Sequence, residues 1–336
     1  MHKSLRTLLR AVSTAAAALM AVLTGPASAE NYKASPAMAI ELRHASWFDG
    51  DKLQRGNLYI EDGVFVAQRP RQVNRLLELR AQTLVPPLAD AHNHNLQSAW
   101  GLDRFGQDYL RDGVFYAAMM CADPAGVAQV RDRIDSPEAP DVIFATACIT
   151  SSDGQPLAML QSGEAPMSMD QIVDKAVLIM DTPEDVARKW PLVKDRRSDL
   201  VKVIMSYHDR PELRQQPEQR GKLGVTPAVM QDVVRRAHAD GLRVVVHIES
   251  AADFEAAARA GADFIAELPG YYPQHGEAPD THLISAEAAV IAAEKKVSVI
   301  TATVATRLFQ PSPELLAQIE DVQKRNLARL KEAGVR

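Results

Sequence analysis

The sequence predicts an α/β protein with a (β/α)8-type TIM barrel that is incomplete at its C-terminus and has a small N-terminal β-sandwich layer. Two observations lead to this fold class. From residue 84 onward, short apolar segments alternate with helical patterns, which is typical of a parallel sheet. No glycine-rich dinucleotide-binding turn follows the first apolar segment, and this favours a barrel over an open doubly wound sheet.

Residues 1–29 have the three-part layout of a secretory signal peptide. A basic start precedes an uncharged run from residue 11 to residue 25, and Ala27-Ser28-Ala29 is a small-x-small cleavage pattern. The run is too short for an ordinary membrane span. We therefore expect a periplasmic or secreted protein that has no membrane partner after cleavage. The alternative is an uncleaved N-terminal anchor.

Residues 30–83 read as an N-terminal β layer. Three segments, 39–42, 57–60 and 64–67, have the composition of short strands. Asp49-Gly50-Asp51 and Glu61-Asp62-Gly63 are turn signals between them.

Residues 84–336 supply the predicted barrel. Seven apolar segments in this range are strand candidates: 84–91, 113–121, 142–149, 200–205, 242–247, 263–268 and 297–303. Capping residues predict helix starts at Thr182, Thr226, Ser250 and Ser312.

An eighth strand is missing from this pattern. The last predicted helix closes at Gly334, and Val335 and Arg336 follow it. We favour a fragment of a longer protein, because a complete helix with its C-cap glycine precedes the stop. The alternatives are an open barrel or one that another chain completes.

Composition narrows the possible partners. Acidic residues outnumber basic residues 43 to 38, giving a formal charge of −5, so no basic surface for a nucleic acid is indicated.

Two cysteines cannot build a disulfide framework or a four-cysteine zinc site. We favour buried thiols at Cys121 and Cys148, with a disulfide as the alternative in an oxidising compartment.

The sharpest chemical feature is Asp90-Ala91-His92-Asn93-His94 at the end of the first barrel segment. Side chains at positions i and i+2 of a strand point to one side, so His92 and His94 should converge. Neutral imidazole is a good ligand for zinc and related divalent metals. Because active sites of barrels lie at the carboxyl ends of their strands, we interpret this pair as metal ligands.

Three further residues occupy comparable positions. Lys202 lies inside the fourth strand, where an amine is costly unless it is paired, neutralised or modified. His247 ends the fifth strand and Glu267 the sixth. A lysine that extends to the rim, a core histidine and a structural carboxylate are the alternatives for these three.

The combination of these features resembles the amidohydrolase superfamily. The resemblance rests on LVPPLADAHNHN, on the strand lysine, on VVVHIESAADFEAAARAGADFIAELPG and on the leading β layer, and it extends from residue 39 to the end. Members are metal-dependent hydrolases on a (β/α)8 barrel beside a small β-sandwich. The resemblance implies that His92, His94, Lys202 and His247 bind one or two divalent ions per chain, with zinc expected, and that Lys202 carries a carbamate.

The chain departs from the family pattern at two positions. The strand-six ligand is usually histidine and is Glu267 here. Glutamate oxygen can bind a divalent metal, so Glu267 is either a ligand or a sign that the second site is lost. The aspartate of strand eight, which the family uses on the bridging water, would lie beyond Arg336, so the catalytic residue is not assigned.

The resemblance implies metal-assisted hydrolysis, in which a bound cation lowers the pKa of water to about 7. We expect a hydrolase of amide, cyclic amide or dipeptide bonds, acting on a small molecule. Tyr207 and His208 are weaker candidates for substrate contacts. The sequence is also compatible with an oligomer.

Two other functions stay open. The first is a non-catalytic or degenerate metal- or ligand-binding barrel, which Glu267 and the missing strand favour. The second is a mononuclear deaminase of the same superfamily. Lys202 argues against a deaminase, since such enzymes usually lack the bridging lysine, and so does the spacing of His247 and Glu249.

Overall fold

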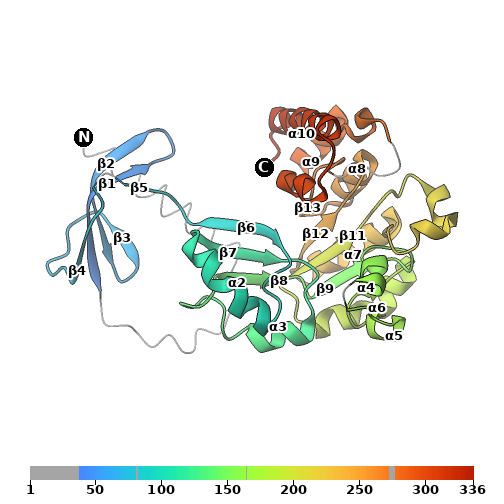
Figure 1. Cartoon of the computed structure of the whole chain (residues 1–336), viewed down its shortest axis with the longest axis horizontal. Coiled ribbons are helices and arrows are strands. Elements are labelled where there is room, and N and C mark those ends of the chain that lie inside the picture. Colours follow the sequence, from blue (N-terminus) through green and yellow to red (C-terminus); the bar gives the residue numbers. More distant parts are fainter. Residues whose placement is uncertain (1–37, 81, 164, 272–276) are drawn as a thin grey trace. The chain divides into compact units, whose positions relative to one another are not determined.

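The computed structural model describes residues 38–80, 82–163, 165–271 and 277–336. The predicted signal peptide lies outside the described residues. The chain forms two compact units, Met1–Pro86 and Pro87–Arg336, called here the N-terminal and C-terminal units and described separately (Figure 1). Among the described residues, no helix has both the length and the apolar character that crossing a membrane requires.

The described part of the N-terminal unit is one five-stranded sheet. Its strands are β1 (Ala39–Phe48), β2 (Leu53–Glu61), β3 (Val64–Val66), β4 (Arg75–Glu78) and β5 (Thr83–Leu84). The order is β3-β2-β1-β4, and β5 also pairs with β1. The β2–β3 turn contains Asp62 and Gly63 at φ values of 51° and 79°, which suit the tight hairpin turn that its sequence predicts.

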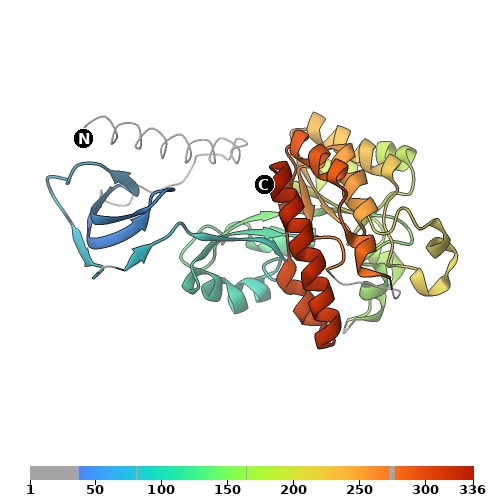
Figure 2. The same cartoon turned by 90° about the horizontal axis from the view of Figure 1, so that it is seen from above.

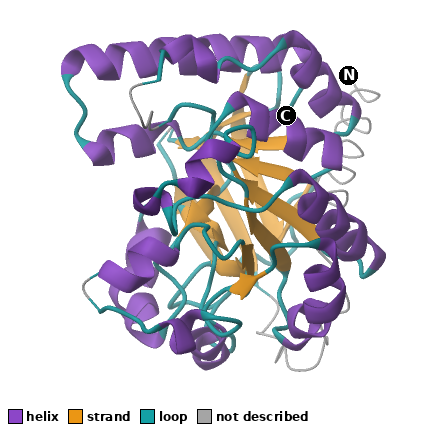
Figure 3. Ribbon diagram, turned by 90° about the vertical axis from the view of Figure 1, so that its right-hand side faces the viewer, coloured by secondary structure: helices purple, strands orange, loops and turns teal. Residues whose placement is uncertain are grey.

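Two parallel sheets form the centre of the C-terminal unit. One has the order β6-β7-β8, and the other has the order β10-β9-β11-β12-β13-β14. Their strands are β6 (Leu88–Asn93), β7 (Val114–Met119), β8 (Asp141–Phe144), β9 (Ala147–Thr150), β10 (Leu178–Ile179), β11 (Leu200–Ile204), β12 (Arg243–His247), β13 (Phe264–Ala266) and β14 (Ser298–Ile300). In Figure 3 the strands lie in the middle of this unit, with helices around them.

Two of the expected strands are interrupted in the structure. Residues 84–91 divide between β5 and β6 at Pro86-Pro87, because proline has no N–H to donate to a sheet. Residues 142–149 divide between β8 and β9. At this break the carbonyl of Thr146 accepts a hydrogen bond of 2.9 Å from the Arg196 guanidinium. This single segment therefore contributes β8 to the three-stranded sheet and β9 to the six-stranded sheet.

Helices follow most strands, and their starts agree with the capping signals. Thr182, Thr226, Ser250 and Ser312 each accept a hydrogen bond from a backbone N–H in the first turn of the helix that follows. The helices are α2 (Ala99–Arg111), α3 (Pro124–Val130), α4 (Leu157–Ser162), α5 (Met169–Ile172), α6 (Pro183–Asp195), α7 (Pro227–Ala239), α8 (Ala251–Ala260), α9 (Ala286–Glu294) and α10 (Pro313–Ala333). Short 3-10 turns are η1 (Pro211–Gln215), η2 (Pro217–Gln219), η3 (Pro279–His282) and η4 (Thr303–Phe309). Figure 2 shows α10 as the long red helix, which contacts α9.

Strand alternation separates the core from the candidate site. Val201 and Val203 of β11 pack with Val229 and Val233 of α7 in the largest apolar cluster. The alternate residue Leu200 belongs to another cluster, on the opposite face of the strand. Lys202 shares that face, so the amine points away from the helices.

Cys121 and Cys148 form a disulfide, so the expectation of two buried thiols is wrong. Cys121 follows β7 and Cys148 lies in β9, and their Cα atoms are 4.9 Å apart, which a disulfide can bridge. The sequence separation of 27 residues gave no indication of this proximity. Cys148 is also the register partner of Lys202 on the adjacent strand.

The disulfide should contribute measurably to stability. Replacing both cysteines with alanine should lower the free energy of unfolding by about 3 kcal/mol, because a cross-link between distant residues restricts the unfolded chain. Urea unfolding of the oxidised protein and the double variant measures this difference. Reduced wild type is the control and should resemble the variant. Coincident unfolding curves for all three samples would contradict the prediction.

Candidate metal centre

All five residues predicted as metal ligands lie in or beside the strands of the C-terminal unit. His92 is in β6 and His94 follows that strand, while Lys202 is in β11. His247 is the last residue of β12, and Glu267 comes directly after β13. Parallel strands place their carboxyl ends at one edge, which is where these side chains meet.

A chain of close contacts connects four of these side chains. His94 Nε2 lies 3.3 Å from His92 Nε2, and His92 Nδ1 lies 3.0 Å from Glu267 Oε1. The other oxygen, Glu267 Oε2, lies 3.0 Å from His247 Nδ1. The structure therefore links His92, His94, His247 and Glu267 from three strand ends through pairwise contacts, while no three of these residues place their ligand atoms within 4.8 Å of one another.

Several atoms of this cluster have hydrogen-bonding capacity that the described residues do not use. Lys202 is 2% exposed, and its Nζ has no hydrogen-bond partner among them. His92 Nδ1 and Glu267 Oε2 are close to their neighbours in distance, but the geometry is not that of a hydrogen bond. Buried polar atoms in this state are costly, and the cost is commonly offset by a bound group.

Burial and charge shift the ionisation of the cluster. Burial lowers the pKa of Lys202, although the Glu267 carboxylate opposes this shift. Burial would raise the pKa of Glu267, but His247 and Lys202 hold it well below its usual value, so the carboxylate is anionic. Burial favours the neutral ring of His247, yet Glu267 and Glu249 raise its pKa to about 9. Burial lowers the pKa of His94 to about 4, so this ring is neutral at pH 7.

Glu267 has an unusual backbone conformation. Its φ is 73°, in the left-handed region that a glutamate seldom adopts, and its N–H donates to the Ile300 carbonyl at 2.8 Å. Strained residues of this kind are concentrated at functional sites.

A second polar group lies beside His247. Glu249 is 2% exposed, and its Oε1 lies 3.1 Å from His247 Nε2. The same oxygen accepts hydrogen bonds from Gln155 Nε2 at 2.9 Å and from the Tyr271 hydroxyl at 3.3 Å. Each nitrogen of the His247 ring therefore faces a carboxylate.

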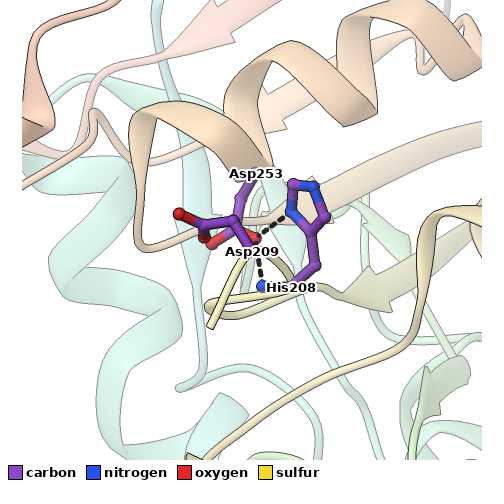
Figure 4. Close-up of side chains that lie close together, drawn as sticks. All are labelled: His208, Asp209 and Asp253. Atoms are coloured by element: carbon purple, nitrogen blue, oxygen red, sulfur yellow. Dashed lines mark hydrogen bonds and ion pairs between the residues drawn. The ribbon is translucent and has the colours of Figure 1, made fainter. Parts of the chain in front are cut away.

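Tyr207 and His208, the predicted substrate contacts, belong to a different arrangement. Asp253 of α8 is fully buried and accepts from the backbone N–H of Tyr207 at 2.8 Å and of His208 at 3.0 Å. It also accepts from His208 Nδ1 at 2.8 Å (Figure 4). In addition, it caps its own helix by accepting from the N–H of Ser250. Asp253 thus ties the segment after β11 to the start of α8, and a role of Tyr207 or His208 toward substrate stays a prediction.

His208, Asp209 and Asp253 are also the group in the described part of the chain whose potential ligand atoms all lie within 4.8 Å of one another. A metal there would compete with the N–H groups that already occupy both Asp253 oxygens. The side chains therefore fit a structural hydrogen-bond network better than an ion site.

Sequence reasoning missed part of this site. Gln155 was not singled out, because it lies in a long segment after β9 without a clear pattern. Tyr271 was not singled out either, and Glu249 entered the sequence analysis only through its spacing from His247. The available signal was a glutamate two residues after the histidine that ends an apolar strand segment.

Solved structures with a similar fold include several hydrolases. A. niger ochratoxinase matches with a TM-score of 0.64 and 17% identity over 90% of this chain and 75% of that chain. A prolidase complexed with N-methylphosphonate-L-proline gives 0.64 and 15%, over 89% and 77% of the two chains. A structure described as an amidohydrolase gives 0.61 and 20%, over 89% and 76%.

These similarities confirm the predicted resemblance to amidohydrolases at the level of fold. No family model matches the chain, and no curated protein matches it. At these identities the shared property is the arrangement of the backbone, and the activity has to be argued from the side chains.

The role of Asp253 as a structural clamp can be tested against a matched residue. Asp253→Asn should lower the free energy of unfolding by about 2 kcal/mol, because the buried carboxylate accepts several hydrogen bonds. Asp185 occupies the same capping-box position in α6 but is more exposed, so Asp185→Asn should cost less. Thermal and urea unfolding of both variants give the comparison. Equal losses would show that the bonds to Tyr207 and His208 add nothing.

Proposed function

We propose that this protein is an exported, metal-dependent hydrolase that cleaves a C–N bond in an amide, cyclic amide or dipeptide. The observation that carries the proposal is the series of pairwise contacts among three imidazoles and a carboxylate at the strand ends. The buried amine of Lys202 interacts electrostatically with Glu267 and His94 of this cluster. Structures with the same fold include a prolidase, a Xaa-Pro dipeptidase and molinate hydrolase, which supports a small-molecule substrate.

We further propose that the two parallel sheets are parts of one incomplete (β/α)8-type barrel. The Ala145 N–H donates to the Met119 carbonyl, and the Asp199 N–H donates to the Phe144 carbonyl, each at 2.9 Å, across the break between β8 and β9. The contact of His92 with Glu267 joins the ends of β6 and β13. Both observations support a curved arrangement in which the site lies at the mouth.

The residues present fit a divalent metal. Imidazole nitrogen and carboxylate oxygen are zinc ligands, and His92 Nδ1 and Glu267 Oε2 retain capacity for a further bond. We propose that His92, His94, His247 and Glu267 hold one or two ions, with zinc preferred. When bound, such an ion supplies a hydroxide at neutral pH and polarises the scissile carbonyl.

Lys202 fits a carbamate better than an ammonium. Its Nζ is buried without a hydrogen-bond acceptor, and burial lowers its pKa, which favours the neutral amine that reacts with carbon dioxide. The carbamate would be anionic and would bring a further oxygen donor to the cluster.

Other residues of the chain would balance the charge of the site and keep water away from it. Glu267 is held anionic and so offsets the positive charge that collects at the centre. The half-buried ring of Tyr271 stands edge-on to His247, with ring centroids 6.2 Å apart, and would exclude water from that side. Together these groups would keep the reacting carbonyl in a dry and fixed position.

Export is supported by the disulfide. A bond between Cys121 and Cys148 persists in an oxidising compartment and is rare in a reducing one. Together with the signal-like residues 1–29, it favours a periplasmic or secreted location.

A degenerate ligand-binding barrel is the second candidate, and one observation favours it. The Glu267 carboxylate lies 3.0 Å from both His92 and His247, so electrostatic attraction between these side chains holds them together without an ion. In this case the protein would bind a small molecule without hydrolysing it.

Metal content tests the site directly. The purified protein should contain one or two zinc ions per chain after dialysis against zinc, and His92→Ala should lose at least one of them, because a direct ligand is removed. His44→Ala is the control, since His44 lies in the N-terminal unit and pairs with Glu78. Plasma mass spectrometry measures the zinc content per chain. Equal zinc contents in wild type and His92→Ala would show that His92 is not a ligand.

Hydrolysis screening separates the enzyme from the binding barrel. The zinc-loaded full-length chain should cleave at least one member of a panel of N-acyl amino acids, lactams and dipeptides. Lys202→Ala should reduce that rate by about a hundredfold or more, because a stabilising group at the reacting centre is lost. His238→Ala on α7 is the control. Zinc binding without cleavage of any compound would favour the binding barrel.

A further inference from the structure

Glu249 is a buried carboxylate that the mechanism above does not use. It lies two residues beyond the end of β12, and its side chain contacts three separate parts of the C-terminal unit. These contacts are His247 at the end of β12, Gln155 in the segment after β9, and Tyr271 in the loop after β13.

Helix initiation does not explain its burial. The cap of α8 is the reciprocal pair of Ser250 and Asp253, in which each side chain accepts the backbone N–H of the other residue. The Glu249 backbone N–H also donates to Asp253, at 3.3 Å, while its side chain is bonded to His247, Gln155 and Tyr271. The carboxylate is therefore free of the capping role.

Among the described residues, no lysine or arginine pairs with Glu249, and its side chain contacts His247, Gln155 and Tyr271. A buried polar group costs free energy unless it is hydrogen-bonded. One oxygen of Glu249 therefore holds groups from three separate segments. Gln155 Nε2 also lies 3.2 Å from Ser206 Oγ, and the Tyr271 carbonyl accepts from the Thr306 hydroxyl at 2.7 Å.

We propose that Glu249 is a positioning residue for the metal centre: it fixes the His247 ring through Nε2 and sets the Gln155 and Tyr271 segments around it. This inference rests on the proposed function, because His247 needs a fixed orientation only if it binds an ion. Carboxylates that accept the second N–H of a ligand histidine orient the ring and raise its basicity.

The test compares Glu249→Gln with Glu255→Gln, which makes the same change on a half-buried side chain of α8 that pairs with Arg259. Zinc affinity is measured by competition with a chelator, and the visible absorption spectrum of the cobalt(II)-loaded protein reports the geometry around the ion. Glu249→Gln should bind zinc about 10 to 100 times more weakly and should shift the cobalt bands. Glu255→Gln should match wild type in both measurements.

The outcomes separate the two proposals. Zinc binding by wild type together with unchanged affinity and cobalt bands in Glu249→Gln overturns the positioning role alone. Failure of the wild type to bind zinc overturns both the proposed function and this inference.

Tyr271→Phe keeps the inference testable if Glu249→Gln does not fold, because it removes one donor to Glu249 and leaves the carboxylate in place. It should shift the cobalt bands and weaken zinc severalfold, and bands identical to those of wild type would count against the positioning role.

Discussion

The arrangement of the site depends on the burial of unlike charges where parallel strands end. Glu267 and His247 lie in an environment that penalises each charge separately, and they are tolerated because they lie beside one another. The carboxylate of Glu267 faces imidazoles from two strands, so its position links β6 to β12.

The surrounding structure holds this charged cluster in place. The disulfide joins the end of β7 to β9 beside Lys202, and Asp253 fastens the segment after β11 to α8. Glu249 adds a third connection, from His247 to the segments after β9 and β13. Because each connection joins different strands, the ends of β7, β9, β11, β12 and β13 are held together by side chains as well as by the sheet.

Much of the fold was accessible from sequence because its signals are local. The capping residues at Thr182, Thr226, Ser250 and Ser312 lie one residue before the observed helices. Apolar runs located the strands, but their interruptions at Pro86-Pro87 and at Thr146 depend on the missing proline N–H and on Arg196, which is distant in sequence. The pairing of Cys121 with Cys148 is likewise a tertiary contact, and the sequence favoured the wrong state.

The candidate site was predictable as a list of residues but not as a network. The sequence indicates each candidate residue by its position: His-x-His at a strand end, a lysine within an apolar strand, and polar residues at the ends of two later strands. It does not indicate the distances between these residues. Gln155 contacts the site from a segment that has no recognisable sequence pattern. The contact between His92 and Glu267 could be found only from the structure, because the two residues are 175 positions apart in the sequence.

The central claim is that the strand-end cluster is where an ion binds. Anomalous diffraction at the zinc edge from crystals of the zinc-loaded protein measures this directly. We predict a peak within bonding distance of His92, His94, His247 and Glu267. A peak at His208, Asp209 and Asp253, with none at the strand-end cluster, would contradict the account.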